Sequence, residues 1–160
     1  MKFHKDGTLP QNGETFVFGS NQAGRHGAGA AKVAHEKFDA VYGSGWGWQG
    51  ENRKSFAFPT KDRGLNTLSL AAIEEAAKQM LGITKRYPEV EFFFTSLGCG
   101  LAGYQPFEIA PMFRDFGDNC SFPDTWKQFL ILDLDEAYKI ALKQDTYLAK
   151  AYVKLYKSKS

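Results

Sequence analysis

Two glycine-rich segments of the sequence contain the residue types that bind phosphate through the backbone. The first follows an apolar stretch and reads GSNQAGRHGAGAA, residues 19–31. The second also follows an apolar stretch and reads LGCGLAGY, residues 97–104. Glycines let backbone N–H groups approach a phosphate closely, and a helix that starts within the first segment would add a partial positive charge. The pattern therefore predicts a phosphate cradle.

Most of the residues that we expect to bind a ligand belong to these two segments. The Asn21 amide can offer a donor and an acceptor to a ribose hydroxyl, and Tyr104 is expected to close over the ligand. Trp46 could stack on adenine, the alternative being that Trp46 and Trp48 fill the core beneath their loop. The expected ligand-binding residues are Gly19, Ser20, Asn21, Gly24, His26, Gly27, Ala28, Gly29, Trp46, Gly98, Cys99, Gly100, Leu101, Ala102, Gly103 and Tyr104.

Apolar patterns and turn signals predict the elements that position these segments. The helix after Ser69 is the clearest, because Leu70, Ile73 and Met80 recur at helical spacing behind a side chain that can cap the helix. Pro111 fits only the first turn of its helix. Expected strands cover 15–19, 40–42, 55–59 and 90–96, and expected helices cover 27–38, the stretch between Ser69 and Pro88, about 107–116, and the chain from 133 onward.

Strands alternate with helices along the chain, which is typical of an α/β fold with a mostly parallel sheet. In such sheets, ligands bind at the carboxyl ends of the strands. Both glycine segments leave strands at that end, so we expect both to face one pocket. We expect a single domain over 1–160, with a core at about 15–133 and a helical tail at about 134–160, where Asp133 and Glu136 resemble a capping box.

Two familiar phosphate-binding motifs do not fit the first segment. The spacing from Gly19 to Gly24 matches the start of a nucleoside-triphosphatase P-loop, but Arg25 and His26 replace the Lys and hydroxyl residue of that motif. The dinucleotide pattern GxGxxG also fails, because no third glycine follows Gly29 at the required spacing.

The order of the two segments resembles the macrodomain family, whose α/β modules bind ADP-ribose. In that family an Asn after a strand and two glycine-rich loops embrace the pyrophosphate and the distal ribose; Ser20-Asn21, HGAGAA and SLGCGLAGY stand in these places. The stretch FAFPTKDRGLNTLSLAAIEEAAKQM, followed by SLGCGL, looks like the terminal ADP-ribose glycohydrolase class, and the resemblance covers about residues 15–116. It implies a macrodomain-like three-layer sandwich, with a mostly parallel central sheet flanked by helices and a C-terminal helical extension.

The same resemblance raises the question of catalysis. In the glycohydrolase class, the Lys of a Thr-Lys pair is the nucleophile, and an Asp directly after GCGL acts as acid or base. Lys61 matches that Lys, but the Asp position is Ala102, which cannot transfer a proton. Lys61 and His26 are the candidate catalytic residues; Asp62 and Glu108 could assist, although a turn residue and a first-turn helix carboxylate explain them more simply.

Composition limits the class of protein. Hydrophobic residues make up 43% of the chain and the net charge is +2, which fits a globular protein and does not indicate a nucleic-acid binder. The six Lys after residue 136 are expected to form the solvated face of the tail helix. The two cysteines have neither disulfide nor metal-ligand spacing, and no apolar run is long enough to span a membrane. We expect a cytoplasmic protein without a signal peptide, and no metal or cofactor.

The function that these features favour is binding of ADP-ribose or a related NAD-derived nucleotide, as a reader or a sequestering protein. Two alternatives stay open: a hydrolase that removes ADP-ribose from protein or nucleic acid, and an interaction module whose pocket is vestigial and whose tail helix docks a partner. The expected partner is ADP-ribose or an ADP-ribosylated macromolecule, with nucleic acid only as such a target. Runs of the GSNxAGRHGAGAA type also resemble phage and bacterial stand-alone relatives, which implies the host cytoplasm if a phage encodes the protein. The oligomeric state stays open.

Overall fold

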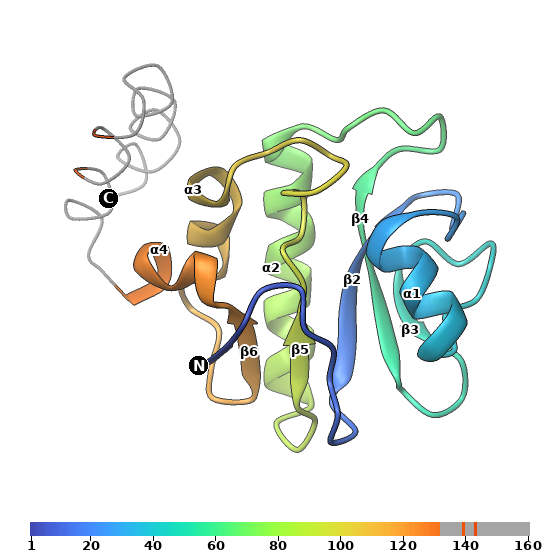
Figure 1. Cartoon of the computed structure of the whole chain (residues 1–160), viewed down its shortest axis with the longest axis horizontal. Coiled ribbons are helices and arrows are strands. Elements are labelled where there is room, and N and C mark those ends of the chain that lie inside the picture. The colour runs from blue at the N-terminus through green and yellow to red at the C-terminus, as the bar shows by residue number, and fades with distance from the viewer. Residues whose placement is uncertain (132–138, 140–142, 144–160) are drawn as a thin grey trace.

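The computed structural model describes residues 1–131, together with Lys139 and Lys143. Over residues 1–131 the protein has an α/β fold, with a six-stranded, mostly parallel mixed sheet and four α-helices (Figure 1). The tail expected from 133 onward, with its capping box and its lysine face, lies outside the described residues apart from those two lysines.

The sheet has the strand order β1-β6-β5-β2-β4-β3. Neighbouring strands are parallel except for β3 and β4, which are antiparallel. The strands are β1 (Lys2–His4), β2 (Thr15–Asn21), β3 (Gly47–Gln49), β4 (Ser55–Lys61), β5 (Phe92–Phe94) and β6 (Cys120–Pro123), and the helices are α1 (Gly29–Lys37), α2 (Leu70–Arg86), α3 (Pro106–Ile109) and α4 (Lys127–Ile131).

The helix expected after Ser69 is confirmed as α2. The Ser69 hydroxyl accepts a hydrogen bond from the backbone N–H of Ala72 at 3.2 Å, which satisfies one free donor of the first turn. Ile73, Ala77 and Met80 are buried on one face of the helix, as the spacing predicts. This face covers one side of the sheet.

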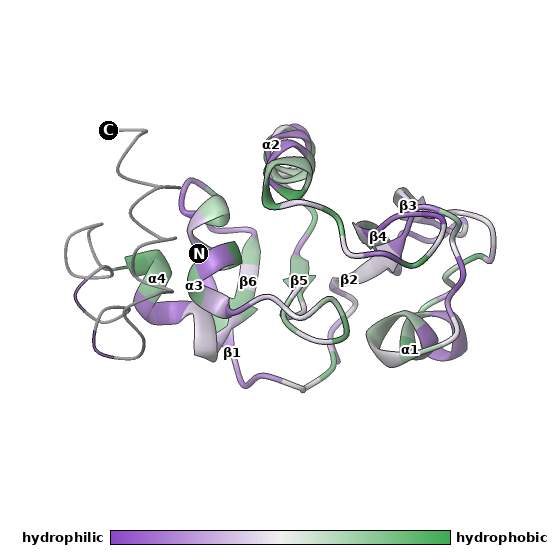
Figure 2. Ribbon diagram, turned by 90° about the horizontal axis from the view of Figure 1, so that it is seen from above, coloured by the Kyte–Doolittle hydropathy of each residue, from purple (hydrophilic) through white to green (hydrophobic). Residues whose placement is uncertain are grey.

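The two faces of the sheet have separate cores, each covered by a different helix. Figure 2 shows α1 and α2 on opposite sides of the strands. Phe16 and Phe18 of β2 are buried together with Ala34 of α1, whereas Val17 belongs to the core on the side of α2. This alternation is what a strand buried on both faces requires.

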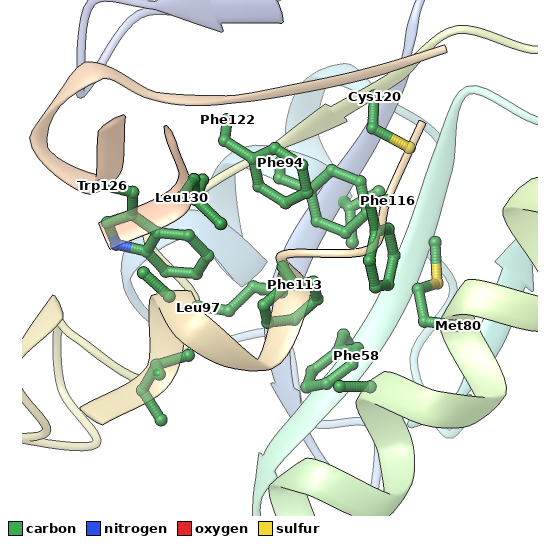
Figure 3. Close-up of a cluster of buried hydrophobic side chains, with 14 of the residues drawn as sticks. Phe58, Met80, Phe94, Leu97, Phe113, Phe116, Cys120, Phe122, Trp126 and Leu130 are labelled. Atoms are coloured by element: carbon green, nitrogen blue, oxygen red, sulfur yellow. The ribbon is translucent and has the colours of Figure 1, made fainter. Parts of the chain in front are cut away.

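The larger core consists mainly of aromatic rings contributed by several elements (Figure 3). Phe94 of β5 stacks on Phe122 of β6 with ring centroids 4.5 Å apart, and Phe113 packs against both rings. Trp126 is fully buried and stacks on Phe122. These contacts fix the positions of β5 and β6, and therefore of the loop that follows β5.

Several sequence-based expectations about the elements are wrong. The strand expected at 40–42 does not form, because the Ala40 N–H donates to the Ala34 carbonyl and the Val41 N–H donates to Gln49 Oε1. These donors are therefore unavailable to a neighbouring strand. The loop expected to hold Trp46 and Trp48 contains β3.

Two more expected elements are shorter than the sequence indicates. The helix expected at about 107–116 is the single turn α3 followed by a 3-10 turn, Ala110–Phe113. Pro111 lies within the 3-10 turn, where its missing N–H removes a donor from an α-helical continuation. The first helix begins at Gly29 rather than Gly27, and the strand expected at 90–96 covers only β5.

Candidate functional site

A cavity of about 870 Å³ lies at the carboxyl ends of β2 and β4 and beside the loop that follows β5. Segments of both glycine-rich loops line it, so the two loops face one cavity. Twelve of the residues singled out from the sequence line this cavity. They are Gly19, Ser20, Asn21, Gly27, Ala28, Gly29, Lys61, Gly98, Cys99, Gly100, Leu101 and Ala102.

The N-terminus of α1 is open toward this cavity. Its N-cap residue, Ala28, provides no side-chain hydrogen bond, and no acidic residue lies in the first turn. Ala28, Gly29, Ala30 and Ala31 all line the cavity. The free N–H groups and the partial positive charge at the start of a helix attract anions. This end of the cavity therefore suits a phosphate.

The second glycine-rich loop approaches the first across the cavity. A methyl group placed on Gly29 would lie 3.5 Å from Leu101 Cδ1, which is ordinary van der Waals contact. Leu101 is 71% exposed. Its loop is held by two backbone hydrogen bonds, from the Gly103 N–H to the Gly100 carbonyl and from the Tyr104 N–H to the Gly98 carbonyl.

Asn21 has a structural contact that the sequence does not reveal. Its Nδ2 donates to the Arg25 carbonyl at 2.8 Å, and its Oδ1 accepts from the Arg25 N–H at 3.1 Å. The side chain thus holds both backbone groups of Arg25, and it keeps one N–H and one lone pair for other partners. Asn21 shapes the first loop in addition to lining the cavity.

His26 does not line the cavity. The ring is fully buried, its Nε2 lies 2.9 Å from the Val41 carbonyl oxygen, and it packs edge-on against Phe18. Burial lowers the pKa of His26 because it disfavours the charged imidazolium. We therefore assign His26 a role in the core beside the first loop, and not the catalytic or ligand-binding role expected from the sequence.

Gly24 is also absent from the cavity wall. Its φ is +69°, and a side chain there would overlap the backbone of Ser44. Gly45 is packed equally tightly against the backbone of Asn21. The two glycines allow loops 21–24 and 43–45 to interlock, so Gly24 serves loop packing rather than phosphate approach.

Three more residues expected to bind the ligand, Trp46, Gly103 and Tyr104, do not line the cavity either. Trp46 packs edge-on against Phe56, with ring centroids 5.4 Å apart, and does not line the cavity. The Tyr104 hydroxyl donates to the Leu68 carbonyl at 2.6 Å, and Tyr104 does not line the cavity. Gly103 has a φ of +87° and forms the turn before Tyr104.

The charged residues of the cavity wall are Arg25, Lys61 and Asp6. Lys61 is half-buried and Arg25 is exposed. Within residues 1–131, the side chains of these two cations form no ion pair or hydrogen bond. Asp6 Oδ1 accepts a hydrogen bond from the Ser96 hydroxyl at 2.7 Å. The wall is thus richer in unpaired positive charge than in negative charge.

The wall formed by residues 4–9 was not predicted from the sequence. β1 pairs with β6 at the edge of the sheet, and the chain that follows β1 passes on the side of α1 (Figures 1 and 2). Asp6 and Leu9 line the cavity as a result. The Asp-Gly pair at 6–7 is a turn signal that could have marked this segment, but nothing in its local pattern connects it to a cavity far along the chain.

The other candidate reactive groups have structural partners. Asp62 Oδ1 accepts from the N–H groups of Gly64 and Asn66, which makes Asp62 a turn residue. Glu108 Oε2 accepts from the Gln105 N–H and completes a capping box at α3. Burial raises the pKa of the Cys99 thiol to about 12, so this free cysteine is a poor nucleophile.

Comparisons of the chain with protein-family models, curated proteins and solved structures find no match. None of the helices in the described part of the chain is long and apolar enough to cross a bilayer. Within the same residues, no three His, Cys, Asp or Glu side chains come together in a way that could hold a metal ion.

Proposed function

We propose that this protein binds ADP-ribose, or a related NAD-derived nucleotide, between its two glycine-rich loops and acts as a reader or a sequestering protein. The observation that carries the proposal is the open N-terminus of α1, which lines the same cavity as loop 97–102. A diphosphate placed between them would meet backbone N–H donors and the positive end of a helix. The arrangement also supports the macrodomain-like architecture that the sequence resembles.

The size and polarity of the cavity support a nucleotide. Its volume of about 870 Å³ lies in the usual range for small-molecule sites, roughly 300–1,000 Å³. Leu9, Phe16 and Val33 give one part of the wall an apolar surface suited to a planar base. Asp6 adds a carboxylate acceptor, and adenine has an exocyclic amino group that can donate to it.

The hydrolase alternative rests on one observation, the unpaired Lys61 at the cavity wall. A lysine nucleophile needs a neighbouring group that accepts or delivers a proton. Of the acidic residues among 1–131, only Asp6 lines the cavity, and its Oδ1 is bound to Ser96. Ala102 lines the cavity without a titratable group. These features favour binding without turnover.

Isothermal titration calorimetry with ADP-ribose tests the proposal directly. Gly27 and Gly100 line the cavity from the two loops, neither has a positive φ, and a side chain at either would enter open space. Gly27→Phe and Gly100→Phe should each abolish binding while leaving the fold intact. Gly82→Phe is the matched control, because Gly82 also faces open space but lies in α2 away from the cavity.

Two results would reject the proposal. One is the absence of wild-type binding at millimolar ADP-ribose. The other is undiminished binding in both blocked variants, which would place the ligand elsewhere. Incubation with ADP-ribosylated protein tests the hydrolase alternative: release of ADP-ribose by the wild type, lost in Lys61→Ala, would establish turnover at this cavity.

A further inference from the structure

Two groups of apolar side chains line the cavity in addition to its glycines. The first group, Leu9, Phe16 and Val33, lies on the face of the sheet that α1 covers. The second group consists of Leu65, in the loop that follows β4, and Leu101, in the second glycine-rich loop. An adenine base placed against the first group leaves the second group for another part of the ligand.

Phe16 and Leu65 are too far apart to contact one ring. Phe16 and Asn21 are five residues apart on β2, a distance of about 16 Å at the usual rise of a parallel strand. Asn21 lies opposite Lys61 at the end of β4, and Leu65 belongs to the turn beyond Lys61, where the chain runs past the end of the strand (Figure 1). A ligand that contacts both Phe16 and Leu65 therefore needs an apolar ring at each end.

A hydrogen bond joins the loops that carry the two leucines. The Thr67 hydroxyl donates to the Ala102 carbonyl at 3.0 Å. Leu65 is two residues from Thr67, and Leu101 directly precedes Ala102. The two leucines are 47% and 71% exposed, and both line the cavity. Leu65 and Leu101 therefore form an exposed leucine rim at this end of the cavity.

Leu65 is held in a backbone conformation that disfavours leucine. Its φ is +65°, in the left-handed region that glycine and asparagine adopt more readily. Asp62 fixes this turn, because its carbonyl accepts from the Leu65 N–H and its Oδ1 accepts from the N–H groups of Gly64 and Asn66. A strained, half-exposed side chain contributes little to the stability of the fold. Backbone outliers of this kind cluster at ligand sites, which favours a ligand contact for Leu65.

The charge beside the rim distinguishes among planar rings. Lys61 lies at the base of the same turn, where its backbone forms a bridge with Thr67, and it lines the cavity. Within residues 1–131 its side chain forms no ion pair or hydrogen bond. A positively charged ring would be repelled by this ammonium group, whereas an uncharged ring would not.

We propose that Leu65 and Leu101 form a second base site, and that the ligand is a dinucleotide with an uncharged planar ring on its terminal ribose. The first ring lies against Leu9, Phe16 and Val33, the diphosphate lies between the glycine-rich loops, and the second ring lies at the leucine rim. This inference rests on the proposed function, because the diphosphate places the ligand in the cavity.

Calorimetry with ADP-ribose, NADH and NAD⁺ tests the second base site. ADP-ribose has the same diphosphate as NADH and lacks the second ring, so the ratio of the two affinities isolates the contribution of that ring. NADH should bind about tenfold more tightly than ADP-ribose, the scale expected from covering the apolar surface of two partly exposed leucines. NAD⁺ should show a smaller gain, because its nicotinamide ring is positively charged and meets Lys61.

Variants of Leu65 assign the gain to the rim. Leu65→Asn should fold as stably as the wild type, because asparagine tolerates a positive φ, and it should lose most of the NADH gain with the apolar surface. Leu65→Met keeps an apolar side chain and should retain most of the gain. Val41→Asn is the matched control, because Val41 is 46% exposed and does not line the cavity. Thermal unfolding of each variant checks the fold.

The outcomes separate this inference from the proposed function. Equal affinities of the wild type for ADP-ribose and NADH, or an undiminished gain in Leu65→Asn, would overturn the second base site, while binding of ADP-ribose still supported the proposed function. A gain for an ADP-ribosylated peptide without a gain for NADH would also overturn it and assign the rim to a protein. Absence of binding by any ligand would reject both proposals. A gain for NADH that is lost in Leu65→Asn and kept in Val41→Asn supports the second base site.

Discussion

Leu101 of the second glycine-rich loop lies against Gly29 at the N-terminus of α1, close enough that a methyl group on Gly29 would be 3.5 Å from Leu101 Cδ1. The two loops therefore approach each other at the edge of the cavity, although about seventy residues separate them along the chain. Leu101 is 71% exposed, so this leucine gains little from folding and could gain more from a ligand.

Leu101→Ala should weaken ADP-ribose binding about fivefold and leave the thermal midpoint of unfolding unchanged. The loss follows from the apolar contact with the ligand, worth about 1 kcal/mol for a partly buried leucine. Calorimetry and thermal unfolding measure the two quantities. Val41→Ala, at an exposed position away from the cavity, is the control and should change neither. A wild-type affinity in Leu101→Ala would exclude this residue from the binding surface.

Gly24→Ala should destabilise the protein by about 2 kcal/mol or more. An added Cβ would overlap the backbone of Ser44, and the φ of +69° is itself unfavourable for alanine. Urea unfolding monitored by circular dichroism gives the free energy of unfolding. Gly82→Ala is the matched control and should stabilise α2 by up to about 1 kcal/mol, because Gly82 lies within a helix and faces open space. Equal effects of the two changes would contradict the interlocked loops.

Tyr104→Phe should lower the free energy of unfolding by about 1 kcal/mol and leave ligand affinity unchanged. The variant loses the hydrogen bond from the Tyr104 hydroxyl to the Leu68 carbonyl, which is 2.6 Å long. The ring does not line the cavity, so binding has no reason to change. Urea unfolding and calorimetry on the same preparation decide the point. A selective loss of affinity would return Tyr104 to the ligand site that its sequence position suggests.

Stability should decrease as the pH falls from 7.5 to 5.5. Burial lowers the pKa of His26 below its ordinary value of 6.5, and the pKa of the half-buried His4 is lowered for the same reason. Below pH 6.5 the unfolded chain therefore binds more protons than the folded protein, and the stability that is fully present at higher pH is lost. The midpoint of urea unfolding at each pH measures the effect.

His26→Gln separates the contribution of this ring from the rest of the pH dependence. Glutamine can still donate to the Val41 carbonyl, which lies 2.9 Å from His26 Nε2, but it does not titrate. The variant should show a smaller decrease in stability between pH 7.5 and 5.5, and adding His4→Gln should reduce the decrease further. An unchanged pH dependence in the double variant would assign it to other groups.

The local sequence pattern was sufficient to predict the helices and strands whose buried residues recur regularly along the chain. α2 repeats its apolar residues every three or four positions behind a capping serine, and β2 is buried along nearly its whole length. Because parallel strands end at the same edge of the sheet, the positions of β2 and β5 along the chain also predicted that the two glycine-rich loops would meet. The loops do line one cavity.

Long-range pairing could not be read from the sequence. β1 has three residues and becomes a strand by pairing with β6, so that Lys2 lies opposite Ser121. Asp6 reaches the cavity only through this pairing. The roles of the individual glycines and of His26 could not be predicted from the sequence either. Gly24 and Gly29 look alike in the sequence, yet Gly24 packs against the backbone of Ser44 and Gly29 lines the cavity.

The interlock of Gly24 and Gly45 has a consequence for how quickly a small molecule could be captured. A first glycine-rich loop that is already seated against loop 43–45 has no closing movement of its own to complete after encounter. Stopped-flow traces would then follow a single exponential whose rate rises linearly with ligand concentration. In such a receptor, related nucleotides are distinguished by their dissociation rates. Substitution of individual side chains of the cavity wall can change a dissociation rate without changing the loop.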